Sequence, residues 1–149
     1  FSTIEKLRKK VPDISLRTTV MVGFPGETEK NFTKLLNDIR MLQFDWLGGF
    51  IYSEQKGTAA CKMNNLVPLK VRKQRLNEIM AAQQKITFLK NKNRVGKTFE
   101  VLTDGKKYGH SEFQSPEIDG KFVFSSEQET GALTKMKILK IKNVYDLLA

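Results

Sequence analysis

Residues 18–28 read TTVMVGFPGET, an apolar and β-branched run that ends in Gly-Phe-Pro-Gly and is followed by apolar residues at helical spacing. This order is typical of a fully buried strand, a tight turn and the start of a helix, which is one step of a parallel α/β sheet. Pro25 fixes its φ, Gly23 and Gly26 allow positive φ or close approach of a ligand, and free N–H groups of the turn are expected to point outward. Ligands of such folds bind at the carboxyl ends of strands, although the local pattern alone favours a plain turn over a ligand loop.

The residues around this segment extend it into a β-α-β unit with flanking helices. Thr28 is the expected N-cap of the helix between the two strands. Apolar periodicity, Pro12 and Pro68 place the other boundaries. The predicted elements are a helix over 1–11, strands over 15–22 and 44–53, and helices over 28–42 and 68–93.

The sequence changes character after Gly96, where short alternating segments are separated by closely spaced turn signals. Such spacing over about 50 residues is typical of a small antiparallel barrel of OB-like size. Strands are predicted over 98–103, 108–114, 121–125, 133–141 and 144–147. The boundary is expected near Arg94–Gly96, giving domains over 1–95 and 96–149.

Charge and cysteine content limit the classes of function. Of the formal net charge of +10, most comes from residues 70–97, which carry nine basic and one acidic side chain. This helix is a candidate for contact with a polyanion, although a solvated basic face is the favoured interpretation. Cys61 is the only cysteine, too few for a disulfide or a protein-made metal site, and no run of about 18 apolar residues occurs. We therefore expect a cytoplasmic protein without a membrane partner.

Two parallel strands do not make a stable domain, so we expect the chain to begin inside a larger α/β barrel. Three segments then carry a resemblance: residues 16–28, residues 52–60 (YSEQKGTAA) and residues 96–102 (GKTFEVL) resemble, in order and spacing, the radical SAM methylthiotransferases. The resemblance implies a fold: an α/β partial barrel, made of the last units of a radical SAM barrel, followed by a TRAM module.

The family has two branches that differ in substrate. Residues 115–120 (SPEIDG) and 145–147 (YDL) resemble the branch that modifies an aspartate of a small-subunit ribosomal protein. The near-neutral barrel, with seven basic and eight acidic side chains over 98–149, also suits a basic protein better than RNA. Modification of a tRNA adenosine is the alternative within the family, favoured by the basic helix. A stand-alone OB-like nucleic-acid-binding module is the alternative outside it.

The resemblance also implies cofactors. Family members bind S-adenosylmethionine on a 4Fe–4S cluster held by a Cys-x-x-x-Cys-x-x-Cys loop, and a further domain holds a second cluster. This sequence contains neither cysteine set, so we expect no catalytic residue, no metal ligand and no bound cofactor in this chain alone. Cys61 is interpreted as a buried or incidental thiol.

The resemblance places part of the S-adenosylmethionine wall in this chain. Arg17 would meet a carboxylate through a bidentate pair, with an ordinary salt bridge as the alternative. The run Gly23, Phe24, Pro25 and Gly26 would approach the adenosyl group through backbone groups. Tyr52, which ends its strand, would stack on adenine or fill the barrel.

Other side chains are assigned by position. Phe50 shares the face of Tyr52 and is expected to fill the barrel. In the barrel domain, Glu117 and Asp119 are candidate contacts to a basic substrate, with a simple hairpin turn as the alternative. His110 is expected at the surface or in a turn, and Trp46 in the core.

Overall fold

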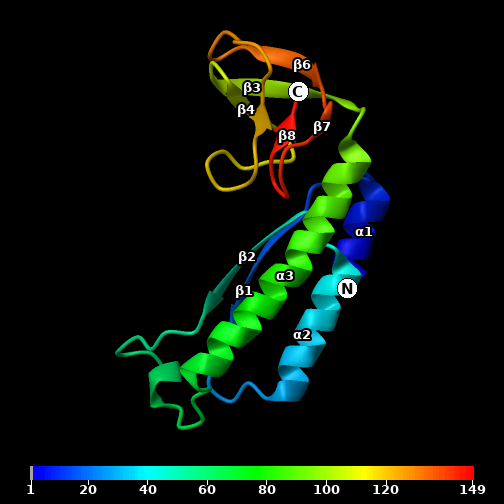
Figure 1. Cartoon of the computed structure of the whole chain (residues 1–149). Coiled ribbons are helices and arrows are strands. Elements are labelled where there is room, and N and C mark those ends of the chain that lie inside the picture. The colour runs from blue at the N-terminus through cyan, green and yellow to red at the C-terminus, as the bar shows by residue number, and fades with distance from the viewer. Residues whose placement is uncertain (1) are drawn as a thin grey trace. The chain divides into compact units, whose positions relative to one another are not determined.

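The computed structural model describes residues 2–149 (Figure 1) and divides within α3 into two compact units, one ending at Ile86 and the other spanning Thr87–Ala149. Phe1, where the first predicted helix begins, lies outside the described residues. The helices are α1 (Ser2–Lys10), α2 (Glu29–Leu42), η1 (Ala60–Lys62, a 3-10 helix) and α3 (Leu69–Arg94). The strands are β1 (Arg17–Val22), β2 (Trp46–Ile51), β3 (Thr98–Gly105), β4 (Tyr108–Ser111), β5 (Phe122–Val123), β6 (Leu133–Lys137), β7 (Lys140–Ile141) and β8 (Leu147–Leu148).

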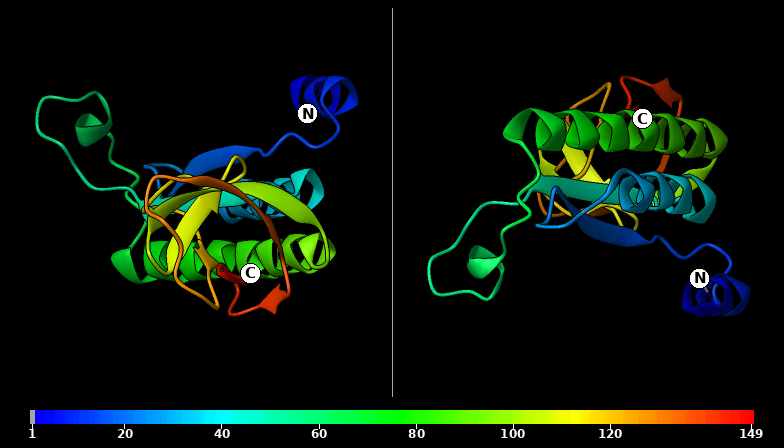
Figure 2. Two further views of the ribbon diagram at one scale, coloured as in Figure 1. Left: turned by 90° about the horizontal axis from the view of Figure 1, so that it is seen from above. Right: turned by 90° about the horizontal axis from the view of Figure 1, so that it is seen from below.

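The first unit contains the predicted β-α-β arrangement. β1 and β2 pair in parallel, with Arg17 opposite Trp46 and Val22 opposite Ile51. The core joins side chains from both strands with the inner faces of α2 and α3: Val22, Phe32, Leu36, Ile39, Leu47, Ile79 and Ile86. The segment that holds η1 projects from the edge beyond β2 (Figure 2).

The prediction that β1 is fully buried is wrong, because the strand alternates between exposed and covered residues. Arg17, Thr19 and Met21 are exposed, whereas Val20 packs against the core and Val22 is completely buried. On β2, Phe50 lies on the same open face as Met21, its partner in the register. Within the described residues α2 and α3 cover only one face of the two strands, so side chains on the other face remain accessible.

The two long helices begin and pack for identifiable reasons. Thr28 caps α2 as predicted, in a capping box in which the Thr28 hydroxyl accepts the Asn31 N–H and the Asn31 side chain accepts the Thr28 N–H. Gln83 of α3, which breaks the apolar periodicity, is 3 % exposed and donates to the Phe44 carbonyl at 2.9 Å. This buried amide therefore satisfies a backbone acceptor just before β2.

The second unit is a six-stranded sheet of order β6-β3-β4-β5-β8-β7. The predicted antiparallel character is wrong for one pair, since β5 and β8 run in parallel. The predicted strand over 133–141 is divided at Ile138, whose carbonyl accepts the Gly96 N–H and whose buried side chain turns into the core. Phe99, Phe113 and Phe122 pack edge to face there.

The last turns of α3 belong to this second unit. Asn91 is fully buried and its Nδ2 donates to the Val144 carbonyl at 3.0 Å. The Arg94 guanidinium lies 4.1 Å from the Phe113 ring centroid and donates to Asn91 Oδ1. The compact units thus separate ahead of the predicted boundary near Arg94–Gly96, and separate folding at that boundary stays a prediction.

None of the described helices combines the length and the apolar character that crossing a bilayer requires.

Candidate functional site

The Gly-Phe-Pro-Gly loop and Tyr52 meet at one edge of the sheet, because parallel strands bring their carboxyl ends together. The Tyr52 N–H donates to the Val22 carbonyl at 2.8 Å, continuing the pairing beyond β2. The rings of Phe24 and Tyr52 pack edge to face with centroids 5.4 Å apart. Phe24 is 42 % exposed, so this edge presents an aromatic surface.

The loop backbone is held by its own chain. Gly23 and Gly26 both have positive φ, at 73° and 84°, as the sequence suggested. The Gly23 N–H donates to Glu27 Oε2 at 2.9 Å, and the Gly26 N–H donates to the Asn65 carbonyl at 2.7 Å. The N–H groups of these two glycines are therefore not available to a ligand, because neighbouring oxygens already accept their hydrogens.

The two glycines differ in the space around them. A Cβ on Gly23 would lie 2.0 Å from Cγ of Arg72, so the close approach at this position is made by an arginine of α3. A Cβ on Gly26 would meet no atom within 4 Å. Only Gly26 offers the open backbone that a ligand could approach.

Tyr52 is the buried aromatic residue of the site. It is 5 % exposed, and its hydroxyl is buried without a hydrogen-bond partner among the described residues. Burial raises the pKa of Tyr52, electrostatic interactions with Glu54 and Cys61 raise it further, and Arg72 lowers it. Phe50 is 46 % exposed, so the described residues do not bury it as the filling interpretation expected.

Arg17 is not brought to this site. It is the first of the six residues of β1, whereas Gly23 directly follows the last. Six strand residues span about 20 Å at the usual rise, so Arg17 and the loop occupy opposite ends of the strand. Its contact with a cofactor carboxylate stays a prediction that the geometry of the loop does not support.

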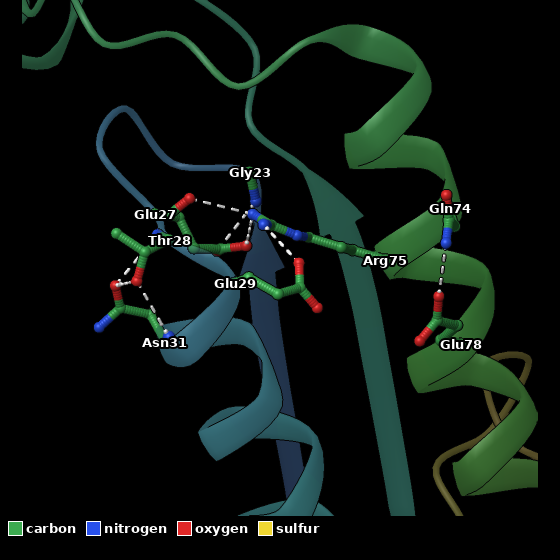
Figure 3. Close-up of polar contacts among 8 residues, drawn as sticks. All are labelled: Gly23, Glu27, Thr28, Glu29, Asn31, Gln74, Arg75 and Glu78. Carbon is green, nitrogen blue, oxygen red and sulfur yellow. Dashed lines mark hydrogen bonds and ion pairs between the residues drawn. The ribbon is translucent and has the colours of Figure 1, made fainter.

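A charged network behind the loop was missed in the sequence (Figure 3). Arg75 of α3 is 6 % exposed and its Nη1 lies 2.6 Å from Glu27 Oε1. Its Nη2 lies 3.1 Å from Glu29 Oε2. Arg75 belongs to the basic run of residues 70–97, and no local sequence signal joins it to Glu27, which lies 48 residues away.

In the second unit, the two acidic candidates behave differently. Glu117 is exposed in a loop and has a φ of 63°. Asp119 Oδ2 accepts the Ser115 N–H at 2.8 Å, so this carboxylate closes the turn. Ile118, between them, is 70 % exposed, an apolar side chain that the sequence argument did not use.

Three residues complete the comparison with the sequence. His110 lies on β4, where Nδ1 and an Asp104 carboxylate oxygen are 2.8 Å apart, so it is paired within the hairpin. Trp46 is buried as predicted, and Cys61 is a partly buried free thiol. Over residues 2–149, no group of three or more His, Cys, Asp or Glu side chains is arranged to hold a metal ion.

Several cations of α3 are used inside the molecule. Arg72 donates to the Tyr52 carbonyl, Arg75 binds Glu27, and Arg94 stacks on Phe113. The exposed lysines of α3 are Lys70, Lys73, Lys85 and Lys92. Fewer positive charges of α3 are therefore available to a polyanion than the composition of residues 70–97 suggests.

Comparison with known proteins finds a domain family for the second unit and relatives along the whole chain. Residues 95–149 match the family model described as TRAM domain, which defines the class of the second unit. Along 100 % of its length the chain is 40 % identical to the ribosomal protein uS12 methylthiotransferase RimO of Phocaeicola vulgatus, covering 36 % of that protein. RimO of Carboxydothermus hydrogenoformans is 40 % identical over 98 % of this chain and 35 % of its own length. RimO of Trichormus variabilis is 42 % identical over 97 % of this chain and 34 % of its own length.

The chain spans about a third of the length of the curated relatives it matches. Along nearly its whole length the chain is similar to the C-terminal part of RimO proteins, and residues 95–149 match the TRAM domain. The resemblance that the three sequence segments carried is confirmed.

Proposed function

We propose that the chain forms the C-terminal part of a cytoplasmic enzyme that adds a methylthio group to an aspartate of ribosomal protein uS12. The observation that carries this proposal is the identity of about 40 % that extends along the whole chain to RimO proteins, rather than along the TRAM domain alone. The first unit then supplies the last part of the catalytic α/β barrel, and the second unit supplies a TRAM module.

The edge formed by the loop and Tyr52 has features that suit the adenosyl part of S-adenosylmethionine. An exposed Phe24 ring offers a stacking surface, Gly26 leaves the backbone approachable, and the Tyr52 hydroxyl is a buried donor without a partner among the described residues. Phe24, Gly26 and Tyr52 are the residues that would contact the adenosyl group. The cofactor, with its cluster, supplies the radical chemistry when bound.

The described residues do not fit the 4Fe–4S cluster itself. They contain the single thiol of Cys61 and no ligand group arranged for a metal. The role that we propose for this chain is therefore to bind and orient the adenosyl group and the protein substrate.

A protein substrate is favoured over tRNA by the charges of the barrel over residues 98–149, which carries seven basic and eight acidic side chains. A near-neutral barrel gains little counterion-release affinity for phosphates. Glu117 and Ile118 are exposed side by side and offer one acidic and one apolar contact to a basic ribosomal protein. The exposed lysines of α3 are the observation that keeps tRNA, or a stand-alone nucleic-acid-binding role, as the second candidate.

The test compares the two substrates directly. A reconstituted full-length enzyme containing this chain is incubated with S-adenosylmethionine and either uS12 or tRNA, and both products are analysed by mass spectrometry. Methylthiolation of the uS12 aspartate supports the proposal. Modification of the tRNA with unmodified uS12 would contradict it, as would tight, strongly salt-dependent RNA binding without any transfer.

A further inference from the structure

Two arginines of α3, Arg72 and Arg75, contact the loop that follows β1 or the residues beside it. The proposed function does not use them. We propose that Arg75 is a positioning residue: through Glu27 it holds residues 23–26 in the conformation that binds the cofactor. The proposal rests on the assignment of this loop to S-adenosylmethionine. Figure 3 shows the contacts that join Arg75 of α3 to Glu27 and Glu27 to Gly23. In this proposal they order the loop before the cofactor binds.

The first step is the contact of Arg75 with Glu27. Arg75 Nη1 donates to Glu27 Oε1 at 2.6 Å and also reaches the Glu27 main-chain carbonyl at 3.1 Å. Nη2 donates to Glu29 Oε2 at 3.1 Å, and the guanidinium lies 5.2 Å from the ring centroid of Phe32. One planar group thus fixes both the side chain and the backbone of Glu27 against α3.

The second step passes from Glu27 to the loop. The other carboxylate oxygen, Oε2, accepts the Gly23 N–H at 2.9 Å. Glu27 therefore bridges the end of the loop to its beginning while Arg75 holds the bridge. Gly23 has positive φ and directly precedes Phe24, so this hydrogen bond holds the backbone from which the Phe24 side chain projects.

A second arginine of α3 contacts both the same loop and the residue that follows β2. Arg72 Nη1 donates to the Tyr52 carbonyl at 2.6 Å, and the Arg72 side chain occupies the space beside Gly23 that a Cβ would need. Arg72 and Arg75 are three residues apart on α3, so they project from the same side of the helix. Both aromatic residues of the site, Phe24 and Tyr52, are thereby held from the same helix, α3.

Burial of this pair argues for a positioning role. The side chains of Arg75 and Glu27 are 7 % and 11 % exposed, so both charges are largely removed from water. A buried ion pair is often no more stabilising than apolar residues of similar volume, because desolvation offsets the attraction. What an apolar pair could not supply is an acceptor for the Gly23 N–H and a fixed loop conformation.

The test uses Arg75→Lys, which keeps the charge but loses the planar fork, and Glu27→Gln, which keeps an acceptor but weakens the pairing. Lys73→Gln, an exposed cation on the same helix, is the matched control. In the reconstituted enzyme we measure amide hydrogen exchange at Gly23 and the dissociation constant for S-adenosylmethionine. For Arg75→Lys we expect exchange at Gly23 and the dissociation constant each to rise about tenfold, and for Lys73→Gln neither to change. Glu27→Gln should shift both in the same direction by less.

Unchanged exchange at Gly23 in Arg75→Lys and Glu27→Gln would overturn the positioning role, whatever the enzyme binds. Faster exchange with unchanged cofactor affinity would also overturn it, because the loop conformation that Arg75 holds would then not matter for binding. Phe24→Ala separates the two failures, because it removes the proposed stacking ring without touching Arg75. Weaker binding in Phe24→Ala keeps the proposed function even where Arg75 fails.

Discussion

At the scale of single residues, glycines with the same backbone conformation serve different purposes in this chain. Gly23 and Gly26 both have positive φ, but only Gly23 has a neighbour, Arg72, in the place of a Cβ. Gly120 lacks room for a different reason, since a Cβ there would lie 1.9 Å from the Tyr145 carbonyl oxygen. Packing therefore accounts for Gly23 and Gly120, whereas Gly26 leaves space for a ligand.

Alanine at the two loop glycines should have unequal effects on stability. Gly26→Ala introduces only the strain of positive φ, about 1–2 kcal/mol in the free energy of unfolding. Gly23→Ala adds a clash with Arg72, and we expect a total loss of about 2–4 kcal/mol. Denaturant titration of both variants measures the difference. Equal losses would show that Arg72 moves aside without cost.

Tyr52 should reveal its role through a single atom. Tyr52→Phe removes a buried hydroxyl that has no partner among the described residues, so we expect the stability near neutral pH to be unchanged or slightly raised. If the hydroxyl serves the cofactor, the same change weakens binding of S-adenosylmethionine by about fivefold to tenfold. Calorimetric titration and thermal unfolding of one variant give both numbers. Reduced stability with unchanged binding would contradict this role.

Because of Tyr52 we also expect the stability of the protein to depend on pH. Burial raises the pKa of Tyr52 above its ordinary value of 10.0, so the folded state resists ionisation that the unfolded state allows. The contribution is fully present below pH 10.0 and is lost as the pH rises through the raised pKa. The wild-type protein should thus lose more stability than Tyr52→Phe in this alkaline range.

In the loop over 115–120, Glu117 is the candidate for contact with the substrate, whereas Asp119 stabilises the turn. We expect Glu117→Lys to slow engagement of uS12, seen as a KM raised severalfold, while cleavage of S-adenosylmethionine is unchanged. Asp119→Ala instead removes the acceptor of the Ser115 N–H and should cost about 1 kcal/mol of stability. Asp119→Asn, which keeps an acceptor oxygen, is its control. An unchanged KM in Glu117→Lys across low and moderate salt would leave the loop as a turn only.

At the scale of elements, α3 is one helix that serves two units. Its first half carries Arg72 and Arg75 to the loop after β1, and its last turns carry Asn91 and Arg94 into the core of the second unit. Helical periodicity predicted its length well, because Pro68 and Gly96 mark its ends. The pattern did not reveal the division of labour, since polar residues such as Gln83 are buried through contacts with distant backbone groups.

This division predicts where the chain is cut by a protease. Limited trypsin digestion should leave a stable C-terminal fragment that begins after Lys85, because Thr87–Arg94 belongs to the compact second unit. Asn91→Ala removes the contact with Val144 and should move the stable cut toward Arg94. Mass spectrometry of the fragments identifies both ends. A stable fragment beginning near Arg94–Thr98 in the unmutated protein would favour the boundary inferred from sequence.

Sequence patterns predicted that the Gly-Phe-Pro-Gly loop and Tyr52 lie at one edge of the sheet, but not which residues of α3 hold the loop. A strand followed by Gly-Phe-Pro-Gly and a second strand ending in Tyr52 were sufficient, since parallel strands place such residues at one edge. Arg75 was not predictable, because its contact with Glu27 joins residues 48 apart in the sequence. Burial of β1 was overestimated because an apolar run does not say how many layers cover it. The parallel pair β5 and β8 was missed because strands of two residues carry no pairing signal.

At the scale of the whole molecule, the net charge of +10 is a poor guide to the partner. Arg72, Arg75 and Arg94 are engaged internally, and the barrel over residues 98–149 is close to neutral. The candidates for recognition are the exposed lysines of α3 and the exposed Glu117 and Ile118 on the barrel. This distribution favours a protein partner, in agreement with the names of the relatives along the entire chain.

The most direct measurement is a competition assay in which the reconstituted full-length enzyme receives uS12 and tRNA together with S-adenosylmethionine. Product mass spectrometry then reports the methylthio group on each substrate. Our account predicts that the uS12 aspartate is modified, that the tRNA is not, and that Glu117→Lys lowers the yield on uS12. Methylthiolated tRNA beside unmodified uS12 would contradict it.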